Sequence, residues 1–164
     1  MAKSEAVSES TEIVDPFTQY DGVPLSDIPD RDPLLNAGRY QFQFVGHKAE
    51  LTQQDDGPVW RVTLMVDPVE YLEEDEPQEG FANLRQFVTY WPRSRRDMKD
   101  QLGSFAVAFG ADPNLPIKDG NEWPALEDAK GGFATAKVVR ATIKRGKRAG
   151  EEIRNLTDFH GDAV

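Results

Sequence analysis

The chain has 164 residues, of which 38% are hydrophobic and 10% aromatic, and its formal net charge is −10. This length suits one ordinary domain, and the lack of cysteine excludes disulfides, thiolate nucleophiles and cysteine-ligated metal sites. No apolar run approaches the ~20 residues that a membrane-spanning helix needs. Residues 1–11 are polar and acidic, unlike a signal peptide. We therefore expect a cytoplasmic protein with no membrane partner.

The charges are unevenly distributed along the chain. Residues 1–81 carry five Lys/Arg and eighteen Asp/Glu, a net −13, whereas residues 82–150 carry thirteen and seven, a net +6. Affinity for phosphates depends on the field within about a Debye length, ~8–10 Å at physiological salt, and not on the total charge. An acidic protein can thus present a basic face to nucleic acid; charges spread only for solubility are the alternative.

Residues 1–33 are expected to form a disordered or extended arm. The first fifteen residues are small, polar and acidic, as in disordered tails. Four prolines follow within an aspartate-rich segment, and each also restricts the residue before it, which disfavours a helix. The arm's apolar residues are candidate anchors on the domain surface: Phe17, Tyr20, Val23, Leu25 and Ile28.

The folded domain is expected over residues 34–157, with a short tail over 158–164. Residues 39–52 alternate aromatic with polar side chains, which is typical of a half-buried strand. Gly46 within it predicts a bulge or bend. An Asp-Asp-Gly-Pro turn leads to a second strand over 59–66. These two strands predict an antiparallel hairpin.

The rest of the domain reads as a loop, a strand, a helix and two more strands. We predict an acidic loop over 67–80, a third strand over 81–91 and, from Ser94 to Gly110, a helix with one apolar stripe. The fourth and fifth strands are predicted over 133–144 and 151–156, with one short helical turn near Trp123 before them. The stripe comprises Met98, Leu102, Phe105, Ala106 and Phe109.

This order of elements predicts a mainly β protein. A helix between strands three and four of a five-stranded antiparallel β-barrel is the arrangement of the oligonucleotide-binding (OB) fold. Another small α+β fold has the same order of elements and remains the alternative.

Signals of catalysis are missing from the sequence. His47 lies in the first predicted strand, and His160 lies in the predicted tail, away from ordered partners. The chain has no zinc-protease, phosphate-loop or nucleophile-elbow motif. The acidic run within 67–79 is more typical of a solvated loop than of a metal site. We predict a protein that is not an enzyme and needs no cofactor.

Aromatic and basic residues share one side of the predicted strands. If Leu84, Val88 and Tyr90 face the core, then Arg85, Phe87 and Trp91 face outward, and Arg61 of the second strand lies beside them. Aromatic rings stack on bases, at ~1–3 kcal/mol each, and cations follow the phosphates of single strands. Core positions for the aromatics and solvated positions for the cations are the alternative. Further candidate cations are Arg93, Arg95, Arg96, Lys137, Lys144, Arg145, Lys147 and Arg148.

Four segments of the domain have a recognisable pattern: Leu34–Tyr40, the strand VWRVTLMV, the helix end FAVAFG and the strand over 152–156. In these segments the chain resembles phage-encoded OB-fold proteins related to single-stranded-DNA-binding proteins, and the resemblance covers about residues 34–160. It implies sequence-tolerant binding of single-stranded DNA in the cytoplasm of an infected bacterium. Replication or recombination proteins are the further partners that this function implies, and the edge strands of a small barrel can also pair with a second copy of the chain.

A structural or assembly protein is the competing interpretation. In that case the proline-rich arm wraps a neighbouring subunit, and the basic clusters pair with acidic loops of other subunits. The acidic loop over 67–79 has several open roles: it repels duplex DNA, covers the binding groove, attracts a basic partner or mimics DNA.

Overall fold

The computed structural model describes residues 18, 21–27 and 33–161. The chain divides into two units, Met1–Asp32 and Pro33–Val164. In the first unit, the described residues include a single turn of 3-10 helix, η4 (Leu25–Asp27), where Leu25 is 86% exposed. The predicted anchors Phe17, Tyr20 and Ile28 lie outside the described residues.

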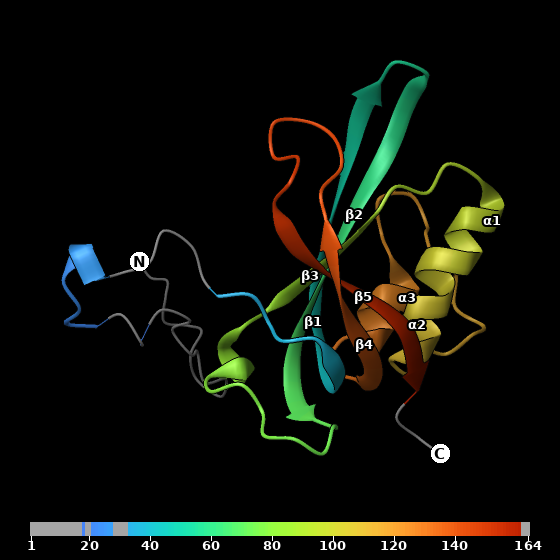
Figure 1. Cartoon of the computed structure of the whole chain (residues 1–164). Helices are drawn as coiled ribbons and strands as arrows, with labels where there is room; N and C mark the ends of the chain where they lie inside the picture. Colours follow the sequence, from blue (N-terminus) through green and yellow to red (C-terminus); the bar gives the residue numbers. More distant parts are fainter. Residues whose placement is uncertain (1–17, 19–20, 28–32, 162–164) are drawn as a thin grey trace, which may run out of the picture. The chain divides into compact units, whose positions relative to one another are not determined.

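The second unit is built on one antiparallel sheet of five strands (Figure 1). The strand order is β3-β2-β1-β4-β5, so β3 and β5 are the two edges. This confirms the mainly β class and the number of strands. The predicted closed barrel is wrong for the described residues, because β3 pairs with β2 alone and β5 with β4 alone. The strands are β1 (Gly38–Gln54), β2 (Gly57–Tyr71), β3 (Gln86–Tyr90), β4 (Phe133–Thr142) and β5 (Glu152–Gly161).

The predicted helix lies between β3 and β4, as expected. It is one helical run made of α1 (Arg95–Asp97), the π-helical η6 (Met98–Gly103) and α2 (Ser104–Ala108). Its first turn is capped by the hydroxyl of Ser94, which accepts a hydrogen bond from the Asp97 amide at 3.0 Å. The turn predicted near Trp123 is a short helix, α3 (Pro124–Ala129). The helices lie together on one side of the sheet (Figure 1).

The core fills the space between the sheet and these helices. Phe44 of β1 meets Phe105 and Phe109 of the helical run, with ring centroids 5.1 and 5.7 Å apart. On β2, Val62 and Leu64 are fully buried. The alternation predicted for β2 and the apolar helix stripe are therefore confirmed, because both face this core. No described helix is long and apolar enough to cross a membrane.

Three strand boundaries differ from the prediction by five residues each: the end of β2, the start of β3 and the end of β5. β2 continues to Tyr71, which pairs with Tyr40, because the β1–β2 ladder extends through the acidic residues after Val66. β3 begins only at Gln86, after a 3-10 turn, η5 (Phe81–Asn83). β5 continues to Gly161, so residues 158–161, placed in the tail by the sequence, are part of a strand.

Two irregularities bend the sheet. The β1–β2 register shifts between Phe44 and Gly46, which confirms the bulge predicted at Gly46. The β4–β5 register shifts between Thr135 and Lys137. Opposite that shift, Asp158 adopts a φ of 63°, a conformation that aspartate tolerates better than most residues.

Candidate nucleic-acid interface

The sheet has two unlike faces, and the candidate residues of β2 and β3 lie on the one away from the core. Side chains alternate along β2, so Val62 and Leu64 point to the core while Arg61, Thr63 and Met65 point the other way. We call this second side the open face. The β2–β3 register pairs Met65 with Phe87, which places Phe87 on the open face as well.

Arg61, Phe87 and Trp91 form what we call the stacking platform. Phe87 is 59% exposed and Trp91 is 37% exposed. The guanidinium carbon of Arg61 lies 5.9 Å from the centroid of the Trp91 ring, a cation–π distance. The strand order explains this grouping, since Thr63 pairs with Thr89 and the next outward residues on the two strands are Arg61 and Trp91. The outward orientation predicted for β3 is thus present.

Three arginines on or beside this platform are bonded to acids of the β1–β2 hairpin. Arg61 donates to Glu50 at 2.6 Å, across the strand pair. Arg85 binds Asp67 through two hydrogen bonds of 2.7 and 3.1 Å. Arg93, just after β3, donates to Asp56 in the hairpin turn at 3.0 Å. The three ion pairs are Arg61–Glu50, Arg85–Asp67 and Arg93–Asp56.

These bonds shift the acid–base equilibria of the groups involved. Hydrogen bonds from Lys48 and Arg61 lower the pKa of Glu50 below its usual value. The hydrogen bond to Asp67 raises the pKa of Arg85. Both shifts favour the charged forms, so the ion pairs persist at neutral pH.

A second group of candidate cations lies in the turn between β4 and β5, residues 143–151, which we call the basic turn. Backbone hydrogen bonds close this turn, among them Gly150 N–H to the Ile143 carbonyl at 2.8 Å. Within the described residues, Lys144, Arg145 and Lys147 are exposed and have no ion-pair partner. Arg148 is instead paired with Glu151 at 3.0 Å.

The remaining candidate cations are distributed over two elements. Arg95 and Arg96 begin α1, where Arg96 pairs with Asp100 at 3.2 Å. Lys137 is exposed on β4 and is opposite Arg39 of β1, on the open face. The sequence-predicted cations therefore do not form one patch: they occupy the platform, the start of the helix, β4 and the basic turn.

The acidic loop is shorter than predicted and is held in place. It spans residues 72–80, because residues 67–71 belong to β2. Glu73 accepts a hydrogen bond from the Arg39 amide at 2.9 Å. Gln78 bonds both the Asn36 amide and the Leu34 carbonyl, at 2.6 and 3.0 Å. The loop thus packs on the segment that enters β1, at the opposite end of the hairpin from its turn.

One tyrosine at the base of this loop has a perturbed pKa. The Tyr71 hydroxyl donates to Asp75 at 2.5 Å, and this bond is the main reason that its pKa is raised to about 12. Ionising the phenol would place two negative charges together and break the bond.

The sequence missed two features of the open face. Phe133 of β4 is 40% exposed and pairs with Gln43, so it adds a third aromatic ring to this face. Period-two alternation applied to β4 would have found it. The acids Glu50 and Asp67 were also missed as arginine partners, because their positions depend on the exact register of the hairpin.

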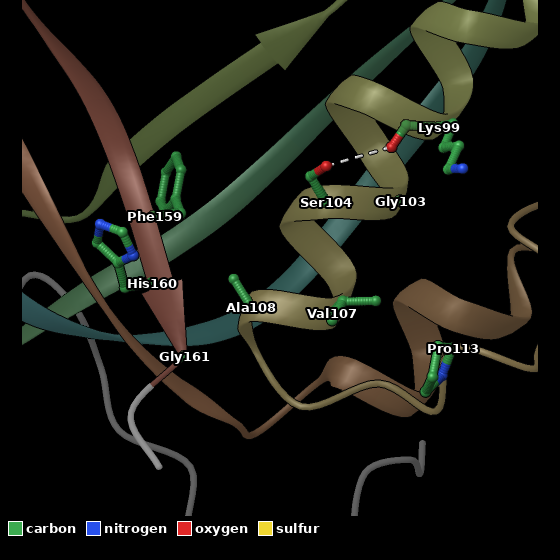
Figure 2. Close-up of a pocket in the computed structure, with 9 residues that line it drawn as sticks. All are labelled: Lys99, Gly103, Ser104, Val107, Ala108, Pro113, Phe159, His160 and Gly161. Atoms are coloured by element: carbon green, nitrogen blue, oxygen red, sulfur yellow. Dashed lines mark hydrogen bonds between the residues drawn. The ribbon is translucent and has the colours of Figure 1, made fainter. Parts of the chain in front are cut away.

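A hollow of about 500 Å³ lies between the helical run and the end of β5 (Figure 2). It contains a serine and a histidine, but the Ser104 hydroxyl donates to the Lys99 carbonyl at 3.4 Å, while His160 bonds Asp158 at 2.8 Å. The expectation that His160 lacks an ordered partner is therefore wrong, because its strand extends further than predicted. Ser104 and His160 do not form a nucleophile–base pair.

Metal binding finds no support in the part of the chain that the structure describes. Within it, no group of three or more His, Asp or Glu side chains is arranged to hold an ion.

A comparison with protein-family models and with curated proteins finds no match to this chain.

Proposed function

We propose that this protein binds single-stranded DNA, with little sequence preference, on the open face of its sheet. The observation that carries the proposal is the stacking platform: two exposed aromatic rings on the same face, Phe87 near the start of β3 and Trp91 just past its end, with Arg61 beside Trp91. Rings held on strands and open to solvent on one side suit the flat faces of unpaired bases.

The surroundings of the platform add to this support. Phe133 of β4 adds a further exposed ring, separated from β3 by two strands, and Lys137 places a cation on the same face. Lys144, Arg145 and Lys147, which have no ion-pair partner among the described residues, offer phosphate contacts in the basic turn. Stacking and phosphate attraction are the two contributions on which sequence-tolerant single-strand binding rests.

The fold that we infer is an opened relative of the OB barrel. The order β3-β2-β1-β4-β5 leaves β3 and β5 as free edges, and pairing those two edges would close the sheet. OB barrels are commonly only partly closed. As the sequence resemblance implies, we assign the protein to phage DNA replication or recombination in the host cytoplasm.

The test is fluorescence anisotropy of a labelled oligo-dT of about 30 nucleotides, titrated at several salt concentrations. We expect Phe87→Ala and Trp91→Ala each to weaken binding by about 5- to 150-fold, since a stacked base contributes ~1–3 kcal/mol. Log K should fall with log salt by about 0.7 for each phosphate neutralised. RNA and duplex DNA of the same length show which nucleic acid is preferred.

Leu51 provides the matched control. It is 59% exposed, like Phe87, but it lies on the opposite side of the β1–β2 hairpin, where it pairs with Trp60. Leu51→Ala should leave the affinity unchanged. Equal losses in Leu51→Ala and Phe87→Ala, or no binding at low salt, would overturn the proposal and turn attention to the assembly-protein alternative.

A further inference from the structure

The three arginines around the stacking platform differ in one respect from Lys144, Arg145 and Lys147 of the basic turn. Each of the three is bonded to a carboxylate of the β1–β2 hairpin, at 2.6 to 3.0 Å. Within the described residues, Lys144, Arg145 and Lys147 have no such partner. Glu50 also pairs with Lys48 at 3.3 Å, so three carboxylates face four cations and leave a formal charge of only +1 at the platform.

The hairpin contributes all three acids. Glu50 lies on β1, Asp56 in the turn and Asp67 on β2, whereas Arg85 and Arg93 flank β3. Strand pairing brings these charges together, since Glu50 is directly opposite Arg61 in the register. Side chains in the three pairs are 30–70% exposed, so a bound strand that reaches the platform meets both partners of each pair.

A platform with little net charge has different affinities for single and double strands. Duplex DNA offers mainly phosphates, at one charge per ~1.7 Å of axis, and non-specific binding to it depends almost wholly on cations. A single strand also offers base faces, and stacking on aromatic rings needs no net charge. Carboxylates beside the rings repel every phosphate, but only the single strand has a compensating interaction there.

We propose that Glu50, Asp56 and Asp67 determine the selectivity of this face for single strands over duplex. This inference rests on the proposed function. The three carboxylates neutralise Arg61, Arg93 and Arg85, and so remove the phosphate attraction that a duplex requires. The single strand keeps its affinity through Phe87 and Trp91.

The test is the triple variant Glu50→Gln, Asp56→Asn, Asp67→Asn, titrated with oligo-dT and with a duplex of equal length. An exposed ion pair contributes little, so each arginine is released at small cost to the fold. We expect duplex affinity to rise by about 10- to 100-fold, with a salt dependence steeper by about 0.9 for each arginine that gains a phosphate. Oligo-dT affinity should rise less, so the single-strand preference should fall, at most by the gain in duplex affinity.

The control raises the net charge by the same three units in the acidic loop. Glu74, Glu76 and Glu79 have no side-chain ion pair among the described residues, so Glu74→Gln, Glu76→Gln, Glu79→Gln changes charge without releasing an arginine. Its single-strand preference should stay near that of the wild type. Circular dichroism and thermal melting verify that both variants are folded.

The outcomes distinguish a failure of this inference from a failure of the proposed function. Absence of wild-type binding to oligo-dT refutes the proposed function. Wild-type binding with an unchanged preference in the hairpin variant overturns the inference alone. The inference is also overturned if the loop variant changes the preference as much, or if oligo-dT binding weakens in the hairpin variant, since the acids would then be holding the arginines in place for the ligand.

Discussion

Replacing Gly132 with alanine tests how closely the helical run packs on the sheet. A Cβ at this position would lie 1.9 Å from the carbonyl oxygen of Phe109 and 3.1 Å from that of Ala129. Both neighbours are backbone atoms, so no side-chain rotation relieves the overlap. Either the end of α2 or the start of β4 must move by more than 1 Å, about the difference from an ordinary ~3.4 Å contact.

The size of the effect follows from what that movement disturbs. Overpacking a well-packed site costs about 1–3 kcal/mol. Gly132 also donates to the Ala129 carbonyl at 2.9 Å and accepts from the Phe44 amide at 3.0 Å, and weakening one such bond costs a further ~1 kcal/mol. We expect Gly132→Ala to lower the free energy of unfolding by about 2–4 kcal/mol, a fall in Tm of roughly 5–15 °C for a chain of this size.

Chemical denaturation measures this change, and Gly103→Ala is the control. A Cβ at Gly103 would have an ordinary contact of 3.6 Å with the Met98 carbonyl oxygen. Because Gly103 is in a helical run, alanine there should be neutral or stabilising by up to ~1 kcal/mol. If Gly132→Ala is as stable as the wild type, the close approach of β4 to α2 is wrong.

Three further outcomes are expected. Burial is the main cause that lowers the pKa of His47, so the folded protein favours the neutral imidazole. The stability that this group contributes is complete above about pH 6.5 and is lost as the pH falls. Urea unfolding at about pH 7.5 and 5.5 should therefore show a smaller loss of unfolding free energy at the lower pH in His47→Gln than in the wild type. Tyr71→Phe should remove from an ultraviolet phenol titration one tyrosine with a pKa of about 12; an unchanged curve contradicts the Tyr71–Asp75 bond. Lys144→Ala should weaken oligo-dT binding at low salt but not near 1 M salt, where the Debye length is ~3 Å. Phe87→Ala should weaken binding at both salt concentrations. Equal salt responses of the two variants would mean that Lys144 and Phe87 do not contribute charge and stacking separately.

Alternation in the sequence was sufficient to predict which strand residues face the core. Val62 and Leu64 are buried and Phe87 is exposed, as the period of two requires. The helix stripe followed from its period in the same way. These patterns are local, since each depends on residues within one element, and they remain valid although the sheet does not close into a barrel.

The features that the sequence could not supply depend on contacts between distant segments. Closure of a barrel requires β3 to meet β5, about 65 residues later in the chain, and no local pattern determines whether those edges pair. The extension of β2 to Tyr71 depends on pairing with Tyr40, which overrides the acidic, loop-like composition there. The extension of β5 likewise depends on the pairing of His160 with Thr135.

Strand pairing also explains why the basic part of the sequence does not form one basic face. Residues 1–81 are net acidic and residues 82–150 net basic, but β3 pairs with β2, so the two parts meet along the hairpin. Arg85 and Arg93 therefore lie against Asp67 and Asp56. The basic turn lies instead between β4 and β5, where within the described residues Arg148 alone is paired with an acid. Charge that is segregated in the sequence is mixed at the platform and stays separate at the turn, so the proposed function requires stacking and phosphate attraction to come from different parts of the sheet.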